Sequence, residues 1–444
     1  MNFLIICSFY PPDSAISAVR PYMFAKYLSK MGHKVTVLRS GKFDSKPDNQ
    51  FKDNNAVEVI SFLGEDCDAE RFSRGDYIVS GSGKASAESP SKALNCIKSI
   101  YHFINEPFFA RSRIKKAKEK FVLQKMAIDS MHQDFDIVIS TYSEIENVFA
   151  GEYAAKHFNA KWIMDFRDSI VDHIHSSRYI WNMYARKWQK HAICEADLCT
   201  TVSEGLTEEI NAFDRKAHVE TLYNGYDEEE QSTACEIAGG KLTICYTGMI
   251  YGLRLNALTY LVKAIRKLVD DKSISKEDIV FAYAGSNSNS VRHLFSEYSL
   301  SEMVEDHGMV SRTEALTIQN RADAFLVLSW NTKTTKGILT GKFYEGIRAG
   351  KPIISIVDGD VPNSELKYLN QQYNYGFCYE PCDEKTNIAD LAKYILCLCR
   401  EKATLGKIQY KQSVKLEYAF RYDKIVQKLN DLASQLCKEE NRAI

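Results

Sequence analysis

Short apolar runs alternate with helical patterns along most of the chain, and this alternation is the feature that most limits its fold. Phe3–Phe9 is a continuous apolar run that ends near a pair of prolines, Val19–Met31 has helical periodicity, and Val35–Leu38 is a second apolar run. Fully apolar strands are typical of parallel sheets that are covered by helices on both faces. The order of strand, helix and strand therefore predicts a βαβ unit.

The alternation continues through the first half of the chain and restarts after a polar segment. In the first half, further strands are expected at Asp136–Ser140, Trp162–Asp165, Leu198–Val202 and Thr221–Tyr223. The segment at 228–241 is polar and ends in two glycines, which is typical of a linker between domains. After it, strands are expected at Leu242–Thr247, Ile279–Ala284, Ala324–Ser329 and Ile353–Val357.

These two series predict an α/β protein with two doubly wound, Rossmann-like domains that face each other across a cleft. We place the first domain at residues 1–226, a linker at 227–241 and the second domain at 242–410, followed by a terminal helical segment at 411–444. Between residues 41 and 93 the alternation weakens, and the Gly/Ser-rich stretch Ser80–Ser91 predicts an insertion or a loop.

Charge and cysteine content exclude several classes of function. The 57 Lys and Arg residues nearly balance the 58 Asp and Glu residues, so bulk attraction to nucleic acid is not expected. The 12 cysteines form no CxxC pair and no zinc-ligand spacing, and free thiols in this number indicate a reducing cytoplasm. The N-terminus lacks the basic region and cleavage site of a signal peptide, and no apolar run reaches the ~20 residues that span a bilayer. We therefore expect a cytoplasmic protein.

The stretch from Lys336 to Val357 carries the strongest candidate for ligand binding. Thr340 and Gly341 suit a helix N-terminus, and Gly350 followed by a proline suits its end. A helix N-terminus presents unpaired amides and partial positive charge to an anion such as phosphate, and Lys342 adds a full charge there. Glu345, one turn further on, is an acceptor suited to the two hydroxyls of a ribose. The alternative is an ordinary amphipathic helix on which Lys342 and Glu345 form a solvated pair.

Polar residues also follow the predicted strands of the first half, where ligands of α/β proteins bind. Thr141, Tyr142 and Ser143 follow one strand, and Arg167 and Asp168 follow the next. For Arg167 the alternative is a local ion pair with Asp165 or Asp168. The loop after the first strand is not GxGxxG, which disfavours a dinucleotide-dependent dehydrogenase.

The stretch at 97–123 interleaves basic and aromatic residues on an otherwise neutral protein. Its basic residues are Lys98, Arg111, Arg113, Lys115, Lys116, Lys118 and Lys120, and its aromatic residues include Tyr101, Phe103, Phe108 and Phe109. Such a surface suits an anionic membrane face and a lipid-linked acceptor. The alternative is a helix whose lysines are simply solvated.

Taken in order, several segments resemble bacterial glycosyltransferases of the GT-B fold, family 4. They are YPPDSAISAVRPYMFAKYLSKMGHKVTVL, DIVISTYS, WIMDFRD, TVSEGL, YNGYD, CYTGMIYG, FAYAGS, HGMVSR and LTGKFYEGIRAGKPII. The resemblance covers nearly the whole chain. It implies a retaining, metal-independent transferase of hexosyltransferase type that moves a sugar from a nucleotide diphosphate-sugar to a glycan or lipid-linked acceptor in surface polysaccharide biosynthesis. It also implies that the terminal helix at 411–444 packs back on the first domain.

The resemblance assigns roles to matching positions. In the second half, Glu345 would bind the ribose and Gly341, Lys342 and Arg254 the diphosphate. Gly248 would allow close approach of the phosphates, while Gly285, Ser286 and the segment from Val310 to Arg312 would border the base. In the first half, the acceptor would lie near Ser14, Ser17, Thr141, Tyr142 and Ser143. Arg167, Asp168 and Lys342 are the predicted catalytic residues. No cofactor is expected beyond the nucleotide-sugar co-substrate, and no nucleic acid partner.

The sequence departs from the family pattern at three places. The family's first glutamate, eight positions before Glu345, falls at Gly337. The glycine pair after the first strand is replaced by Ala15 and Ile16, and the histidine expected after Ser140 is missing. These departures leave two alternatives open. One is a nucleotide-sugar epimerase of the same fold, and the other is a non-catalytic subunit that binds nucleotide-sugars. The Asp-x-Asp pairs at 134/136 and 358/360 have the character of turn residues, so no catalytic metal is expected.

Overall fold

The computed structural model describes residues 1–13, 16–40, 56–63, 92–173, 178–230 and 240–440. Ser14, the stretch at 80–91 and most of the predicted linker lie outside these ranges. The described chain forms two compact units. Unit 1 comprises residues 1–202, 206–222 and 426–444, and unit 2 comprises residues 203–205 and 223–425.

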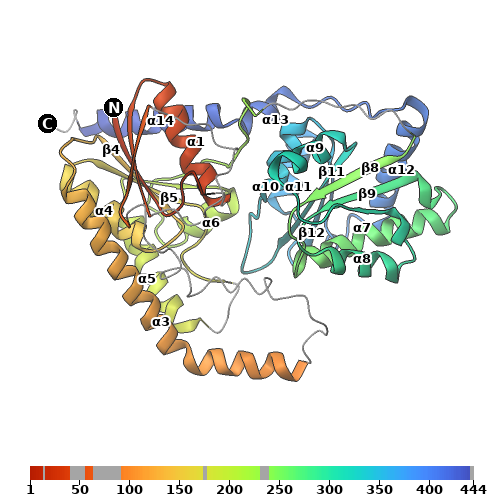
Figure 1. Ribbon diagram of the computed structural model, residues 1–444, viewed down its shortest axis with the longest axis horizontal. Helices are drawn as coiled ribbons and strands as arrows, with labels where there is room; N and C mark the ends of the chain where they lie inside the picture. The colour runs from red at the N-terminus through yellow and green to blue at the C-terminus, as the bar shows by residue number, and fades with distance from the viewer. Residues whose placement is uncertain (14–15, 41–55, 64–91, 174–177, 231–239, 441–444) are drawn as a thin grey trace. The chain divides into compact units, whose positions relative to one another are not determined.

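Unit 1, drawn in Figure 1, is built on a parallel sheet of strands. The sheet has seven strands in the order β3-β2-β1-β4-β5-β6-β7. The strands are β1 (Asn2–Cys7), β2 (Lys34–Arg39), β3 (Val57–Ser61), β4 (Ile137–Tyr142), β5 (Lys161–Phe166), β6 (Leu198–Thr201) and β7 (Val219–Thr221). In β1, β2, β4 and β5, five successive residues are buried, as expected of strands covered on both faces. The strand order reverses between β1 and β4, and such a reversal is where ligands bind in open α/β sheets.

The helices of unit 1 cover this sheet. They are α1 (Ile16–Lys30), α3 (Lys92–Asp129), α4 (Glu146–Phe158), α5 (Tyr179–Glu195), α6 (Glu204–Asn211) and the C-terminal α14 (Tyr422–Glu440). The terminal segment, predicted as helical over 411–444, is split within the described residues into α13 (Val414–Ala419) and α14, and Arg421 between them pairs with Tyr226. From Val426 onward α14 belongs to unit 1, and Asn430 hydrogen-bonds the His33 ring at 2.7 Å.

Unit 2 repeats the architecture with a parallel sheet of six strands in the order β10-β9-β8-β11-β12-β13. The strands are β8 (Leu242–Thr247), β9 (Ile279–Ala284), β10 (Val304–Asp306), β11 (Ala324–Asn331), β12 (Ile353–Gly359) and β13 (Gly376–Tyr379). The helices are α7 (Leu253–Asp270), α8 (Ser288–Glu297), α9 (Arg312–Arg321), α10 (Gly341–Ala349), α11 (Glu365–Tyr373) and α12 (Ile388–Leu405), with short 3-10 turns at Lys276–Asp278 and Ser301–Met303. The prediction of an α/β protein with two doubly wound sheets is confirmed, and the reversal in unit 2 lies between β8 and β11.

Helix α10 forms where the sequence predicts it. Thr340 precedes it in extended conformation, and Gly350 ends it at φ 64°, in the left-handed region that favours glycine. Phe343 and Ile347, four residues apart, are both fully buried. This packing fixes the first turn of α10 beside the carboxyl end of β8.

Candidate functional site

The candidate site in unit 2 lies where the strand order reverses. Strand β8 ends at Thr247, and the backbone N–H of Gly248 donates to the Ala284 carbonyl at 2.7 Å, which joins the ends of β8 and β9. Gly248 has φ +148°, and a Cβ atom there would lie 3.0 Å from Cε of Lys342. The end of β8 and the first turn of α10 are therefore in van der Waals contact, and a glycine is required between them.

The Glu345 carboxylate is the centre of this site. Its two oxygens accept hydrogen bonds from Nζ of Lys342 at 2.7 and 2.8 Å. Nη1 of Arg312, at the start of α9, donates to Oε1 at 3.2 Å. The Gln319 amide and the Thr247 hydroxyl donate to Oε2. Lys342, Arg312 and Glu345, all predicted from the sequence, are thus brought together by α9 and α10.

Two cations keep the Glu345 carboxylate ionised in a buried position. Only 8% of Glu345 is exposed, and burial by itself would raise the pKa of its carboxyl. The charges of Lys342 and Arg312 outweigh this effect and hold its pKa below the ordinary value. Conversely, Glu345 and Glu230 raise the pKa of Arg312 against the opposing effect of burial. At neutral pH Glu345 is therefore a carboxylate, and it faces the Lys342 and Arg312 side chains.

A second layer of polar residues, which the sequence did not identify, surrounds Glu345. Nη2 of Arg312 donates to Glu230 at 3.0 Å, and Nη2 of Arg348 donates to Oε1 of Gln319 at 2.8 Å. The Arg348 side chain is only 2% exposed. Arg348 lies on the same helix as Glu345, so helical spacing was the one signal available for it, whereas nothing in the sequence singles out Gln319 or Glu230.

The first turn of α10 has the features of an anion site. The amides of Gly341 and Lys342 have no partner within the helix, because the first turn lacks preceding carbonyls. Thr340, the residue before the helix, makes no side-chain capping hydrogen bond, and its buried hydroxyl has no hydrogen-bond partner in the described part of the chain. Gly341 is exposed. Backbone donors, a helix dipole and the Lys342 ammonium group therefore lie together.

The other residues predicted to bind the donor lie at the same edge of the sheet. The Arg254 guanidinium stacks against the rings of Tyr251 and Trp330, at 5.3 and 5.6 Å from their centres, and donates to the Met249 carbonyl. A Cβ atom on Gly285 would lie 2.1 Å from the Gly248 carbonyl oxygen, so these loops also touch. The Ser286 hydroxyl donates to Asn287, and Val310 is half-buried two residues before α9.

Position 337 differs from the pattern of the resembling family. Gly337 has φ +66°, a left-handed conformation that side-chain-bearing residues rarely adopt. The backbone here suits the glycine that the sequence contains, and no carboxylate is present at this position.

The predicted acceptor residues of unit 1 gather at the carboxyl ends of β1, β4 and β5. Nη1 of Arg167 donates to the Ser17 carbonyl at 3.2 Å. Asn147 was not predicted, and its amide donates to the Thr141 carbonyl at 3.1 Å and to the Ser143 hydroxyl at 3.4 Å. Tyr142 is half-buried at the end of β4, and Asp168 is exposed after β5.

The predicted alternative of an ion pair between Arg167 and Asp165 is wrong. Asp165 instead pairs with Arg20 of α1, whose Nη2 donates at 2.8 Å and whose Nε lies 3.0 Å from the second oxygen. The Thr200 hydroxyl of β6 donates to the same carboxylate at 2.7 Å. Both charged side chains are buried, so the pair joins α1 to the strand that leads into Arg167.

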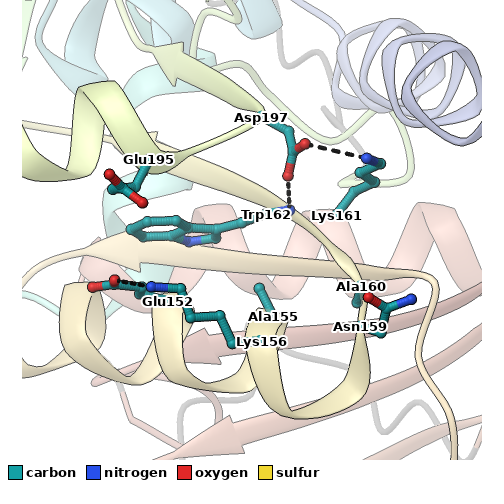
Figure 2. Close-up of a pocket in the computed structure, with 9 residues that line it drawn as sticks. All are labelled: Glu152, Ala155, Lys156, Asn159, Ala160, Lys161, Trp162, Glu195 and Asp197. Atoms are coloured by element: carbon teal, nitrogen blue, oxygen red, sulfur yellow. Dashed lines mark hydrogen bonds and ion pairs between the residues drawn. The ribbon is translucent and has the colours of Figure 1, made fainter. Parts of the chain in front are cut away.

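A separate pocket of unit 1, of about 200 Å³, lies at the opposite edge of the sheet (Figure 2). It is lined by the last turn of α4 and the first residues of β5, at the amino end of that strand. In Figure 2 Asp197 is bound to the Trp162 amide and to Lys161, and Lys156 is bound to Glu152, while the Glu195 carboxylate also lines the pocket. Because ligands of doubly wound sheets bind at the carboxyl edge, this pocket is not the candidate site.

Within the described ranges, no three His, Cys, Asp or Glu side chains come together in a way that could hold a metal ion. No helix in the described part of the chain combines the length and apolar character needed to cross a bilayer.

No protein-family model matches the chain, and no curated protein matches its sequence. Solved structures match over almost its whole length. A sucrose-phosphate synthase from Thermosynechococcus elongatus has a TM-score of 0.64 at 13% identity, covering 98% of each chain. The lipopolysaccharide outer core galactosyltransferase WaaB has a TM-score of 0.55 at 12% identity, covering 97% of this chain and 98% of that one. HepE from Anabaena, solved in complex with UDP-glucose, has a TM-score of 0.54 at 13% identity, covering 98% of this chain and 100% of that one. This likeness shows that the chain has the GT-B fold.

Proposed function

We propose that the chain is a retaining, metal-independent glycosyltransferase of hexosyltransferase type. It would move a sugar from a nucleotide diphosphate-sugar to a glycan or lipid-linked acceptor in surface polysaccharide biosynthesis, at the cytoplasmic side of the membrane. The observation that carries the proposal is the arrangement of Lys342 and Glu345 on the first turn of α10, in contact with Gly248 at the reversal of strand order. The UDP-glucose bound to HepE, a protein of the same fold, supports a nucleotide-sugar as the donor.

The reaction creates charge that this site is suited to stabilise. Breaking the bond between the anomeric carbon and the diphosphate leaves negative charge on the leaving group and oxocarbenium character on the sugar. The Lys342 ammonium group and the amides at the start of α10 would stabilise the departing diphosphate most strongly in the transition state. These donors are already positioned, so little reorganisation accompanies the reaction.

A nucleotide diphosphate-sugar would replace the hydrogen bonds between Lys342 and Glu345. Lys342 is only 23% exposed and bonds both oxygens of Glu345. The diphosphate oxygens would accept the hydrogen bonds of the Lys342 ammonium group. The ribose hydroxyls would then donate to the Glu345 carboxylate in place of Lys342. Arg312 would hold the carboxylate ionised and oriented during this exchange.

We place the acceptor at the carboxyl ends of the strands of unit 1. The acceptor hydroxyl would attack the anomeric carbon from the face that the diphosphate leaves, and its proton would pass to the departing phosphate oxygen. The new glycosidic bond then has the same configuration as the bond that broke. Arg167 and Asp168, which follow β5, would position the acceptor.

A screen of nucleotide diphosphates and their sugars by thermal shift tests the donor site, because a ligand that binds only the native state raises the melting temperature. We expect a shift with at least one nucleotide diphosphate, and little or none in Lys342→Ala or Glu345→Ala. Lys393→Ala, which removes an exposed lysine of α12, is the matched control and should behave as the wild type. Turnover should be almost lost in the two site variants while both remain folded. Full activity in either one would discard this donor site.

Gly337 favours a second candidate, a non-catalytic subunit that binds the nucleotide-sugar. The position where the resembling family carries a glutamate has no side chain to contact the transferred sugar. Donor binding without release of nucleotide diphosphate in any acceptor mixture, lipid extracts included, would support this candidate. Conversion of the donor alone into an isomer would instead identify an epimerase.

A further inference from the structure

Helix α3 of unit 1 contains Pro107 and is bent in Figure 1, and it exposes apolar and basic side chains at helical spacing on both sides of that proline. Residues three or four apart on a helix lie above one another. Tyr101, Ile104, Phe108, Val122 and Met126 are spaced in this way and are all more than half exposed, with Ile104 at 68% and Phe108 at 71%. Arg111, Lys115 and Lys118 continue the same row and are exposed as well. We call these eight residues the α3 face.

The opposite side of α3 attaches the helix to unit 1. Its buried residues are Glu106, Ala110, Ala117, Lys120, Gln124 and Ile128. Gln124 donates to Asn147 at 2.8 Å, and Lys120 pairs with Glu146 at 2.9 Å. The core contacts of α3 are therefore made by a different side, and the α3 face is exposed within the part of unit 1 that the structure describes.

These contacts also correct the prediction for the 97–123 stretch. Lys120, predicted as part of a basic surface, is buried between Glu144 and Glu146 and does not belong to that surface. Arg113 is also withdrawn, because it lies over the Trp181 ring and pairs with Glu106. Among the side chains that the structure describes, the charge of the exposed row is thus carried by Arg111, Lys115 and Lys118. Lys116 is half-buried, and the side chain of Lys98 lies outside the described part.

The α3 face is strongly asymmetric in charge. Glu119 is the one acidic residue that borders it among the described residues from 101 to 126, and it lies 3.7 Å from Lys115. The apolar residues lie before Arg111 and after Lys118, so aromatic and aliphatic groups flank the basic cluster. A surface that combines large exposed apolar groups with a net positive charge marks an interaction site.

Helix α5 packs beside α3 through Phe103, Glu106 and Arg113, which do not belong to the α3 face. In Figure 1 the N-terminal part of α5 lies beside α3, and the Phe103 and Tyr179 rings are 4.9 Å apart. Tyr179 is partly exposed and Met183, one turn later, is 69% exposed. Further along α5, Arg186, Lys187 and Lys190 are exposed.

We propose that the α3 face docks on the surface of an anionic lipid bilayer. Tyr101, Ile104 and Phe108 would enter the acyl chains, and the basic residues would lie at the headgroups. Charge complementarity selects this partner, because anionic headgroups match the basic cluster and the bilayer interior matches the apolar residues. A nucleic acid would leave Ile104 and Phe108 in water. The inference does not depend on the proposed transferase activity, since binding to lipid is measured without turnover.

Co-sedimentation of the full chain with vesicles tests this docking. We expect binding to phosphatidylcholine vesicles that contain roughly 30% phosphatidylglycerol, little binding to phosphatidylcholine alone, and release by salt. Each Lys or Arg near an anionic surface contributes about fivefold in partitioning, so Arg111→Gln/Lys115→Gln/Lys118→Gln should bind roughly a hundredfold more weakly. Ile104→Ser/Phe108→Ser should weaken binding in all salt conditions. Lys393→Gln/Arg400→Gln/Lys411→Gln, which removes the same charge from exposed positions of unit 2, is the matched control and should bind as the wild type.

Three outcomes would overturn the proposal. The first is equal binding to neutral and anionic vesicles, and the second is unchanged binding of the Arg111/Lys115/Lys118 variant. The third is a lipid-free dimer, measured by light scattering, that the Ile104→Ser/Phe108→Ser variant abolishes, because the α3 face would then be covered by a second copy. Circular dichroism of each variant establishes that loss of binding is not loss of fold.

Discussion

Replacing Arg20 by methionine tests how the candidate acceptor edge is supported. Arg20 and Asp165 have side-chain exposures of 1% and 0%, and the guanidinium bonds both carboxylate oxygens. After Arg20→Met, the Thr200 hydroxyl still donates to Asp165. A buried carboxylate that loses its cation costs about 3–5 kcal/mol, because desolvation is no longer offset. That is a large part of the ~5–15 kcal/mol that stabilises an ordinary domain.

Denaturation by guanidinium chloride, followed by tryptophan fluorescence, measures this loss. Of the 4 tryptophans, Trp162, Trp181 and Trp188 lie in unit 1, so the signal reports mainly on the unit that contains the pair. We expect the free energy of unfolding of Arg20→Met to fall by about 3–5 kcal/mol. In Arg20→Met/Asp165→Leu most of this loss should be recovered, because replacing a whole buried pair by apolar groups is often neutral.

The double variant separates this mechanism from lost packing, because Arg20→Met/Asp165→Leu loses the same guanidinium contacts as Arg20→Met but leaves no buried carboxylate without a cation. A loss below about 1 kcal/mol, or a double variant as unstable as the single one, would refute the reasoning.

Three further predictions concern unit 2. Gly248→Ala places a methyl group 3.0 Å from Cε of Lys342 at a φ of +148°. Calorimetry should show at least about tenfold weaker nucleotide diphosphate binding, with a stability loss of about 1–3 kcal/mol. The control Gly406→Ala, at φ +70° with no atom within 4 Å, should leave the affinity unchanged. The lowered pKa of Glu345 means that its stabilising contribution is complete above the unfolded value of about 4.3 and is lost as pH falls through the lower folded value. Denaturation curves at several acidic pH values should therefore show this loss in the wild type and a smaller one in Glu345→Gln. Lys402→Met leaves the buried Asp323, its partner at 2.8 Å, without a cation. Hydrogen exchange of the β8 and β11 amides should show that the free energy of unfolding falls by about 3–5 kcal/mol. Unchanged exchange rates would contradict this expectation.

Local pattern was enough to predict the elements that build the candidate site. The expected helix start at Thr340 and Gly341 and its end at Gly350 are found in α10, because capping and left-handed glycine geometry depend on neighbours in sequence. The strands at 242–247 and 279–284 are found with the predicted bounds. Lys342 and Glu345 lie three residues apart, so helical spacing alone brings them together.

Side chains that pair across a long stretch of sequence could not be predicted from such local patterns. Arg20 lies 145 residues from Asp165, and the sequence offered Arg167 as a nearer partner. The choice is made by the packing of α1 on the sheet, which brings Arg20 to β5. Similarly, Lys120 belongs to a run of basic residues, and only the fold shows that it is buried with Glu144 and Glu146.

Local patterns in the sequence indicate two parallel α/β sheets and a helix that carries a lysine in its first turn and a glutamate one turn later, because periodicity, caps and short spacings act between residues close in the chain. Tertiary structure decided which charges meet: Arg312 and Gln319 with Glu345, Arg20 with Asp165, and which basic residues of α3 face outward. Buried charges are stable only beside a partner, and for these residues the partner is supplied by a different helix or strand.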